Sequence, residues 1–387
     1  MSLNGTLDLD DARGHDWDVV VIGAGVAGAL AAHEIVRLGR RVLLVDQSAF
    51  PRQKTCGDCL NEAALAVLAR VGLAELPRRL GGRAIERLRL AYGGMSAELP
   101  LATGIAVSRS ALDAALVEAA VAAGADFLPE SAAQLGETGP ESRTVVLRQK
   151  ECSASVRARV VIVAAGLSNA CIARSEEFVS RRSRHTRVGA GAVAMTFPAH
   201  YAPGAIYMSV GRRGYVGAVR IEGGGLNLAG AFDPAILHGR SPAAAVEEIL
   251  REAGAPPIPN LDGLSWKGTP PLTCRTFPLA AERVFLVGDA AGYVEPFTGE
   301  GMAWALAGGA AIAPLAVRAV ADWQPGMVRE WSQLFRRIVL RRQWICRGLA
   351  VVVRSQWMSL GAMRMCAWSP RLAAPFVRWI NQPGFAG

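Results

Sequence analysis

The feature that most constrains this chain is a glycine-rich turn between two apolar runs near its N-terminus. The first run, residues 18–22, leads into the hexapeptide GAGVAG at residues 23–28, and an alanine-rich helical stretch follows to Leu38. The second run, residues 41–45, ends at Asp46. This order predicts a strand, a glycine turn, a helix and a second strand, which is the dinucleotide-binding unit of Rossmann-like α/β folds.

Each glycine of this unit has a predicted role in holding a dinucleotide. Gly23 permits the tight turn, Gly25 allows backbone amides to approach a pyrophosphate, and Gly28 allows the helix to pack closely on the strand. The helix N-terminus attracts the phosphate charge. Asp46 is expected to accept hydrogen bonds from the adenosine ribose.

A second block, in the last third of the chain, indicates which dinucleotide is bound. An apolar run at residues 283–287 precedes Gly288 and Asp289. A carboxylate at a strand end beside a helix N-terminus can bind a polyol, while backbone amides meet a polar ring edge. FAD has both groups and NAD lacks the ribityl chain, so the sequence predicts noncovalently bound FAD. The turn-forming residues expected to continue this cofactor site are Pro296, Gly299 and Gly301.

Three blocks together resemble the flavoprotein superfamily of para-hydroxybenzoate hydroxylase-type monooxygenases, flavin-dependent halogenases and geranylgeranyl reductases. They are GAGVAG with Asp46, SRSALDAALVEAA at residues 108–120, and GDAAGYVEPFTGEGM at residues 288–302. The resemblance implies that Asp289 binds the ribityl chain and that Arg109 lies beside the flavin. The residues alone leave open another role for Arg109, as a cap of the helix that follows it.

The resemblance also implies a fold class. It is α/β, with a Rossmann-like FAD-binding domain of the GR2, para-hydroxybenzoate hydroxylase-like type, an inserted β-rich substrate domain and C-terminal helices. Short apolar runs bounded by glycine and proline support the β-rich insertion. The expected parts are a disordered leader at 1–17, an FAD-binding domain at 18–85, 105–180 and 276–325, a substrate domain at 86–104 and 181–275, and a helical region at 326–387.

A fourth block, PRQKTCGDCL at residues 51–60, resembles the PRxKxCG segment of geranylgeranyl reductases. The resemblance implies that its cysteine faces the flavin and the substrate, so Cys56 is the candidate reactive residue. Arg52 and Lys54 are candidate cofactor contacts, and two such cations can lower the pKa of a thiol. Two alternatives stay open: Cys56 is a small packed hydrophobe, or it forms a redox dithiol with Cys59.

Two departures from the superfamily limit the functional prediction. Ala165 precedes Gly166 where aromatic hydroxylases have Asp-Gly, so their NADPH-handling motif does not carry over, and NAD(P)H and a separate reductase both stay open as electron donors. The Trp-x-Trp-x-Ile-Pro motif of halogenases is absent, so halogenation is not expected. The leading hypothesis is monooxygenase-type oxidation of a lipophilic aromatic or polyketide-like molecule. Hydride transfer to an isoprenoid double bond and dithiol-disulfide exchange are the alternatives, and no metal site is predicted.

Charge and composition bear on partners and location. The net charge is +9, and the segment from Trp331 onward has nine arginines and five tryptophans but no Asp or Glu. This pattern suits peripheral contact with an anionic membrane surface, and it equally suits a helical cap over the substrate pocket. No nucleic-acid-binding motif accompanies the charge, so nucleic acid is not an expected partner. Seven cysteines and a polar N-terminus without a signal-peptide pattern indicate a cytoplasmic protein.

Overall fold

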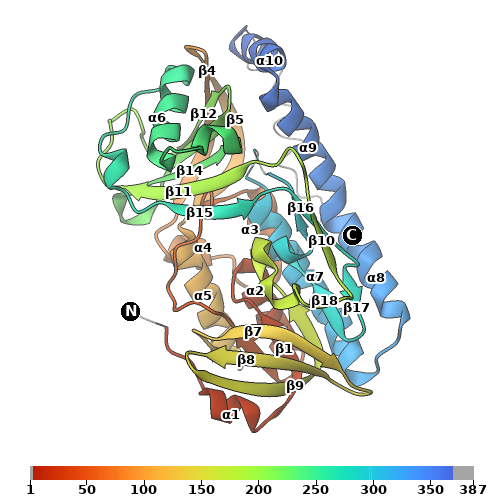
Figure 1. Cartoon of the computed structure of the whole chain (residues 1–387). Coiled ribbons are helices and arrows are strands. Elements are labelled where there is room, and N and C mark those ends of the chain that lie inside the picture. Colours follow the sequence, from red (N-terminus) through yellow and green to blue (C-terminus); the bar gives the residue numbers. More distant parts are fainter. Residues whose placement is uncertain (1–2, 296, 298, 369–387) are drawn as a thin grey trace.

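The computed structural model describes residues 3–295, 297 and 299–368, and it has the predicted α/β class (Figure 1). Its first sheet has eight strands in the order β17-β18-β9-β1-β2-β6, with β8 beside β9 and β7 beside β8. β1 pairs in parallel with β2 and with β9, and its last residues are buried on both faces, as in other parallel sheets. The strands of this sheet are β1 (Asp16–Ile22), β2 (Val42–Val45), β6 (Asp126–Leu128), β7 (Ala132–Thr138), β8 (Arg143–Gln149), β9 (Cys152–Val163), β17 (Ala280–Ala281) and β18 (Val284–Leu286).

Three helices build the core beside this sheet: α2 (Val26–Arg37), α5 (Arg109–Ala122) and α7 (Gly301–Ala321). A small residue lets α7 approach α2 closely, because a Cβ on Gly309 would lie only 2.4 Å from the Ala27 carbonyl oxygen. By length and composition α7 could cross a membrane, but 72% of its most apolar stretch is buried inside the molecule. In this structure α7 therefore packs as a core helix.

The second sheet also has eight strands, in the order β15-β11-β14-β13-β12-β4-β5-β3. β4 pairs with β12, which brings residues 86–104 together with the segment at 181–275. Helix α6 (Pro242–Ala253) packs on β12 and β13, while α3 (Glu62–Arg70) and α4 (Leu76–Arg79) lie between β3 and β4 in the chain. The strands are β3 (Cys59–Leu60), β4 (Arg83–Tyr92), β5 (Met95–Ala106), β11 (Val188–Ala194), β12 (Ala205–Gly211), β13 (Gly214–Arg220), β14 (Leu226–Phe232) and β15 (Lys267–Pro271).

A small third sheet lies beside the two large ones. Its three strands run in the order β10 (Val179–Arg182), β16 (Cys274–Phe277) and β19 (Gly292–Tyr293). Because β19 belongs to the segment that follows Asp289, this sheet ties the predicted flavin segment to both ends of the β-rich insertion.

The N-terminal segment differs from the prediction of a disordered leader at 1–17. Residues 9–13 form a short helix, α1 (Leu9–Arg13), and β1 already begins at Asp16. Leu9, Ala12 and Trp17 are buried, and the Trp17 indole donates a hydrogen bond of 3.0 Å to the Ala12 carbonyl oxygen. The apolar residues spaced among the acids pack on the sheet, and this burial orders the segment.

The C-terminal region is helical, as predicted, through Trp368, and residues 369–387 lie outside the described part of the chain. It consists of α8 (Gly326–Phe335), a π-helical turn (Arg336–Leu340), α9 (Arg341–Arg354) and α10 (Gln356–Trp368). Trp331 on α8 is fully buried and donates a hydrogen bond of 2.9 Å to the Leu286 carbonyl oxygen, which fastens α8 to the first sheet. In Figure 1, α9 then runs along the molecule toward the far end of the second sheet, where α10 contacts β4 and β5.

Candidate functional site

A cavity of ≈1050 Å³ lies between the two large sheets. Part of its wall comes from the glycine turn, the loop at residues 46–60 and the segment around Asp289. Another part comes from β4, β5, β12 and β13 together with α9 and α10. The glycine turn and the Asp289 segment, which lie more than two hundred residues apart in the sequence, therefore line the same cavity.

The glycine turn has the geometry that the sequence predicts. Gly23 has a φ of +102°, and a Cβ there would lie 2.4 Å from the Ala164 carbonyl oxygen. A Cβ on Gly28 would lie 1.8 Å from the Gly23 carbonyl oxygen, so any side chain would force α2 away from the turn. Gly25 is the N-cap of α2 and lines the cavity, which leaves the helix N-terminus open to an anionic group.

Asp46 is buried at the end of β2 and also lines the cavity. Its carboxylate accepts hydrogen bonds from the backbone N–H groups of Ala24, at 2.8 Å, and Ser48, at 2.9 Å. These bonds hold the glycine turn and the following loop in place. Two carboxylate oxygens have about four lone-pair positions between them, so Asp46 can still accept from a ribose hydroxyl.

Arg109 lies in the cavity wall within a cluster of charged groups. Its guanidinium makes two hydrogen bonds with the Asp113 carboxylate, at 2.8 and 2.9 Å, and both side chains are buried. Ser108 caps α5 by accepting from the Ala111 N–H, so Arg109 is not the cap of this helix. Asp113, one turn after Arg109, was not among the predicted site residues, although the spacing of four on a helix allows such a pair.

Arg52 joins this cluster from the loop after β2. Its Nη2 lies 3.5 Å from carboxylate oxygens of both Asp46 and Asp113. A Cβ on Gly25 would lie 3.3 Å from the same nitrogen, so the guanidinium stands directly beside the N-terminus of α2. Arg52 thus adds a positive charge where a pyrophosphate would lie.

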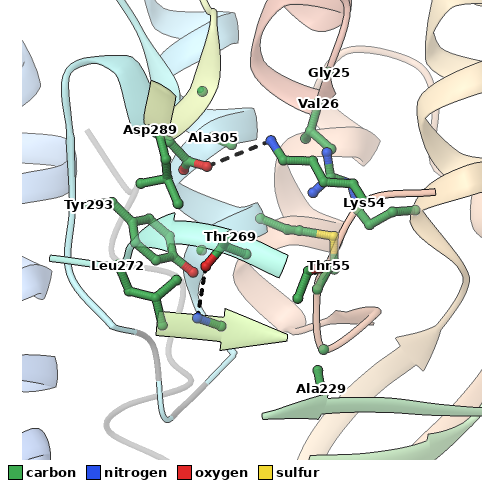
Figure 2. A pocket seen from close by; sticks show the side chains of 18 of the residues that line it. Gly25, Val26, Lys54, Thr55, Ala229, Thr269, Leu272, Asp289, Tyr293 and Ala305 are labelled. Atoms are coloured by element: carbon green, nitrogen blue, oxygen red, sulfur yellow. Dashed lines mark hydrogen bonds and ion pairs between the residues drawn. The ribbon is translucent and has the colours of Figure 1, made fainter. Parts of the chain in front are cut away.

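Asp289 and Lys54 face each other across the cavity, with Nζ and Oδ2 3.8 Å apart (Figure 2). Asp289 follows β18 in a tight turn that begins at Gly288, where φ is +58°. Burial lowers the pKa of Lys54, the neighbouring Arg109 lowers it further, and Asp289 opposes both effects. At 3.8 Å the two groups are not hydrogen-bonded to each other, so both can form hydrogen bonds with the hydroxyl groups of a bound polyol.

The segment after Asp289 brings two more predicted residues to the cavity. Gly299 and Gly301 line it at the N-terminus of α7. Pro296 lies outside the described residues. The predicted backbone amides of a flavin site therefore come from the turn that leads into α7.

Cys56 and Cys59 both line the cavity, and both thiols are free in the structure. The expected lowering of the Cys56 pKa by Arg52 and Lys54 is wrong. Burial raises the pKa of Cys56, and Arg109 offsets only part of that effect. Burial also raises the pKa of Cys59 well above its usual value. Both groups are therefore thiols at neutral pH, able to donate a proton.

Asp58, between the two cysteines, also lines the cavity, although the sequence pattern does not predict it as a site residue. It is 4% exposed and has a φ of +52°, a left-handed conformation that few residues other than glycine adopt. Its Oδ1 accepts from the Arg109 N–H at 3.3 Å, and its Oδ2 has no hydrogen-bond partner among the described residues. Burial raises the pKa of Asp58 well above its usual value, although Arg109 lowers it. The sequence around Asp58 does not predict its positive φ, so it does not predict that this carboxyl lies in the cavity.

The wall beyond Cys56 is apolar. Among the described residues, those contributed by β4, β5, β12, β13, α9 and α10 include no charged side chain. They are mostly aliphatic: Leu88, Leu90, Tyr92, Leu99, Leu101, Ile206, Met208, Val210, Tyr215, Val219, Val352, Val353, Ser359, Met363 and Met365. This part of the cavity suits a hydrocarbon chain.

Helix α9 forms ion pairs with the segment that follows Asp289. Glu295 is buried between Arg187, at 3.0 Å, and Arg354 of α9, at 3.1 Å. Glu300, also buried, lies 3.8 Å from Arg342 of α9. These ion pairs join α9 to the segment that follows Asp289. Their partners lie far apart in the sequence, so the spacing of residues does not predict them.

The described residues fit FAD, since the glycine cradle excludes side chains, the helix N-terminus and Arg52 face the cavity, and Asp289 offers a carboxylate to a polyol. Residues 16–208 match the model of a family described as an FAD binding domain. This chain contains an FAD-binding domain of that family. The proteins that it resembles in fold or in sequence include flavin-dependent halogenases, a monooxygenase and digeranylgeranylglycerophospholipid reductases.

Solved structures of similar fold include flavin-dependent halogenases and monooxygenases. The structure of p-nitrophenol 4-monooxygenase PnpA from Pseudomonas putida aligns with a TM-score of 0.78 over 95% of this chain and 96% of that chain. The two sequences are 15% identical, so the likeness shows the fold.

Curated proteins that are similar to this chain in sequence include two reductases. A menaquinone reductase of Mycolicibacterium smegmatis is 44% identical over 103 residues, which are 25% of this chain and 24% of that protein. The match to that relative thus spans about a quarter of its length. Digeranylgeranylglycerophospholipid reductase 1 of Methanopyrus kandleri is 29% identical over 337 residues, covering 79% of this chain and 82% of that protein.

Proposed function

We propose that this oxidoreductase saturates carbon-carbon double bonds in a polyprenyl lipid. The observation that carries the proposal is the wall of the cavity. The part of the wall that comes from β4, β5, β12, β13, α9 and α10 is apolar and has no charged side chain among the described residues. A polyprenyl chain presents only hydrocarbon, so it loses no hydrogen bonds with water on entering such a space.

The names of the relatives support the same substrate class. The match to a digeranylgeranylglycerophospholipid reductase covers most of both chains, and the shorter match is to a menaquinone reductase. We therefore rank reduction ahead of the oxygenation that the sequence favours. Monooxygenase-type oxidation of a lipophilic aromatic molecule is the competing outcome of the test below.

Bound FAD in its reduced form supplies a hydride. The residues of this chain supply the remaining requirements of alkene reduction, which are a proton, an oriented substrate and a dry site. Cys56 holds its proton at neutral pH because burial raises the thiol pKa. We assign it as the donor of the proton that completes the saturated bond, and the aliphatic wall orients the chain and excludes water.

Asp58 and Lys54 are assigned supporting roles. The Asp58 carboxyl, whose pKa burial raises well above its usual value, holds the first residue of α5 by accepting from the Arg109 backbone N–H. Lys54 and Asp289 would hold the polar middle of the cofactor. NAD(P)H and a separate reductase both remain candidate electron donors.

The test is to reduce the purified flavoprotein under argon and then to add geranylgeraniol, which has no quinone ring to accept electrons. We expect the absorbance of oxidised flavin to return without oxygen. A phenol of similar size is the control acceptor and is expected to have no effect. Substrate-dependent oxygen consumption in air, with no anaerobic reoxidation, would show that the enzyme is a monooxygenase. Loss of activity in both single serine variants of Cys56 and Cys59, with a titrating dithiol, would favour disulfide exchange.

A further inference from the structure

The two last described helices present an apolar outer face. Among the described side chains of these helices, five large hydrophobic ones are exposed, and the two tryptophans stand out: Trp357 is 85% exposed and Trp344 is 64% exposed. The face consists of Trp344 and Val351 on α9 and of Trp357, Met358 and Met365 on α10, and we call it the cap face. Positions 344 and 351 lie two turns apart on α9, and 357, 358 and 365 lie together on α10, so each helix has one apolar stripe directed outward.

The surroundings of the cap face are positively charged. Residues 331–368 contain seven arginines and no Asp or Glu, and two of these arginines, Arg342 and Arg354, pair with Glu300 and Glu295 of the flavin segment. Arg336, Arg337, Arg341 and Arg364 are exposed. Arg347 lies over the Trp344 ring at 4.9 Å, and Arg275 of β16 lies over the same ring at 5.8 Å. Arginine beside tryptophan, with no acid to compensate it, complements a surface that is negative outside and apolar beneath.

The opposite sides of the same helices close the cavity. Val352 and Val353 of α9 and Ser359 and Met363 of α10 line it. Met365 lines the cavity and is also 50% exposed, so the cavity wall and the cap face meet at this residue. The cap and the membrane-facing surface that the sequence left as alternatives are therefore two sides of one pair of helices.

We propose that the cap face binds the surface of an anionic phospholipid bilayer, with the tryptophans at the interface and the cavity opening beside Met365 toward the lipid. The exposed arginines supply attraction to the anionic headgroups. The proposal goes beyond the reaction and is independent of it, because a lipid surface would serve reduction and oxygenation alike.

The test is co-sedimentation of the purified holoprotein with vesicles of equal parts phosphatidylcholine and phosphatidylglycerol. The wild-type protein is expected to bind, to bind pure phosphatidylcholine vesicles more weakly, and to release as salt rises, because the screening length falls to roughly 8–10 Å at ordinary ionic strength. A Trp344→Ala, Trp357→Ala double variant is expected to bind roughly tenfold more weakly or worse.

The matched control is Met195→Ala, which removes an equally exposed hydrophobic side chain, 69% exposed, at the end of β11. It should bind vesicles like the wild type, and all three proteins should keep their FAD absorbance, since neither tryptophan lines the cavity. No binding of the wild type to the anionic vesicles, or equal binding by the double variant, would overturn the proposal. So would a wild-type dimer that the double variant turns into monomers without vesicle binding, because the cap face would then join two copies of the chain.

Discussion

Alanine at Gly309 adds one methyl group where α7 crosses α2, and the structure predicts that the two helices must move. The new Cβ would lie 2.4 Å from the Ala27 carbonyl oxygen and 3.2 and 3.3 Å from two further backbone atoms of the same residue. Backbone atoms cannot rotate out of the way as a side chain can. Gly308 is the matched control, because a Cβ there would meet its nearest atom, Phe335 Cε2, at 3.6 Å, an ordinary contact.

The magnitude follows from comparing the two variants. Replacing glycine with alanine inside a helix gains about 0.8–1 kcal/mol of intrinsic helix propensity, and this gain is common to both substitutions. Overpacking a tight contact costs about 1–3 kcal/mol, and only Gly309→Ala incurs it. The free energy of unfolding should therefore be about 1–3 kcal/mol lower for Gly309→Ala than for Gly308→Ala, with the Gly308 variant equal to or above the wild type.

Urea unfolding followed by far-ultraviolet circular dichroism, with all proteins at the same FAD concentration, measures this difference. Because Gly25 at the start of α2 lies in the cofactor cavity, the Gly309 variant should also lose FAD more readily on dialysis. Equal stability of the two variants, or greater damage at Gly308, would refute the close packing of α7 on α2.

Four further outcomes are expected from substitutions at the site. Asp289→Ala removes the proposed ribityl contact and should weaken FAD retention by about 1–3 kcal/mol in a fluorescence titration; unchanged affinity would remove Asp289 from the site. Cys56→Ser should slow turnover far more than Cys59→Ser under the same conditions; equal losses would contradict the assignment of Cys56. Burial raises the pKa of Asp58 in the folded protein. The wild type should therefore lose stability relative to Asp58→Asn as the pH rises from about 4, the usual Asp pKa, through the raised pKa. Parallel stability curves of the two proteins would show that the Asp58 pKa is not raised. Truncation after Pro325 removes the ion pairs between α9 and the flavin segment and should abolish FAD retention. A truncated protein with full flavin content would show that α9 is not needed to hold the cofactor.

The parts of the site that sequence predicts are those set by local backbone geometry. Gly23 and Gly28 are needed because side chains at these positions would strike backbone atoms, and this requirement leaves the GAGVAG pattern in the sequence. Asp46 and Asp289 follow apolar strands directly, and parallel strands of one sheet end at the same edge. Short segments of the sequence therefore suffice to predict the fold class and the cofactor.

The parts that sequence does not predict depend on burial and on distant contacts. The pKa of Cys56 shifts upward because the folded chain removes it from water, an effect that outweighs the nearby cations. The pair of Arg354 with Glu295 joins residues 59 positions apart and forms only when α9 lies along the flavin segment. The leader, too, is ordered by the burial of Leu9 and Trp17, in addition to the N-cap that Asp8 gives to α1.

The measurement that tests the central claim most directly is the mass of the product after a single anaerobic turnover. The dithionite-reduced holoprotein is mixed with geranylgeraniol under argon, the lipid is extracted, and its mass spectrum is compared with that from a Cys56→Ser sample. The account predicts a product heavier by two hydrogens for each bond saturated in the wild type, and far less of it in the variant. Unchanged lipid under argon, together with a product heavier by one oxygen in air, would contradict the account.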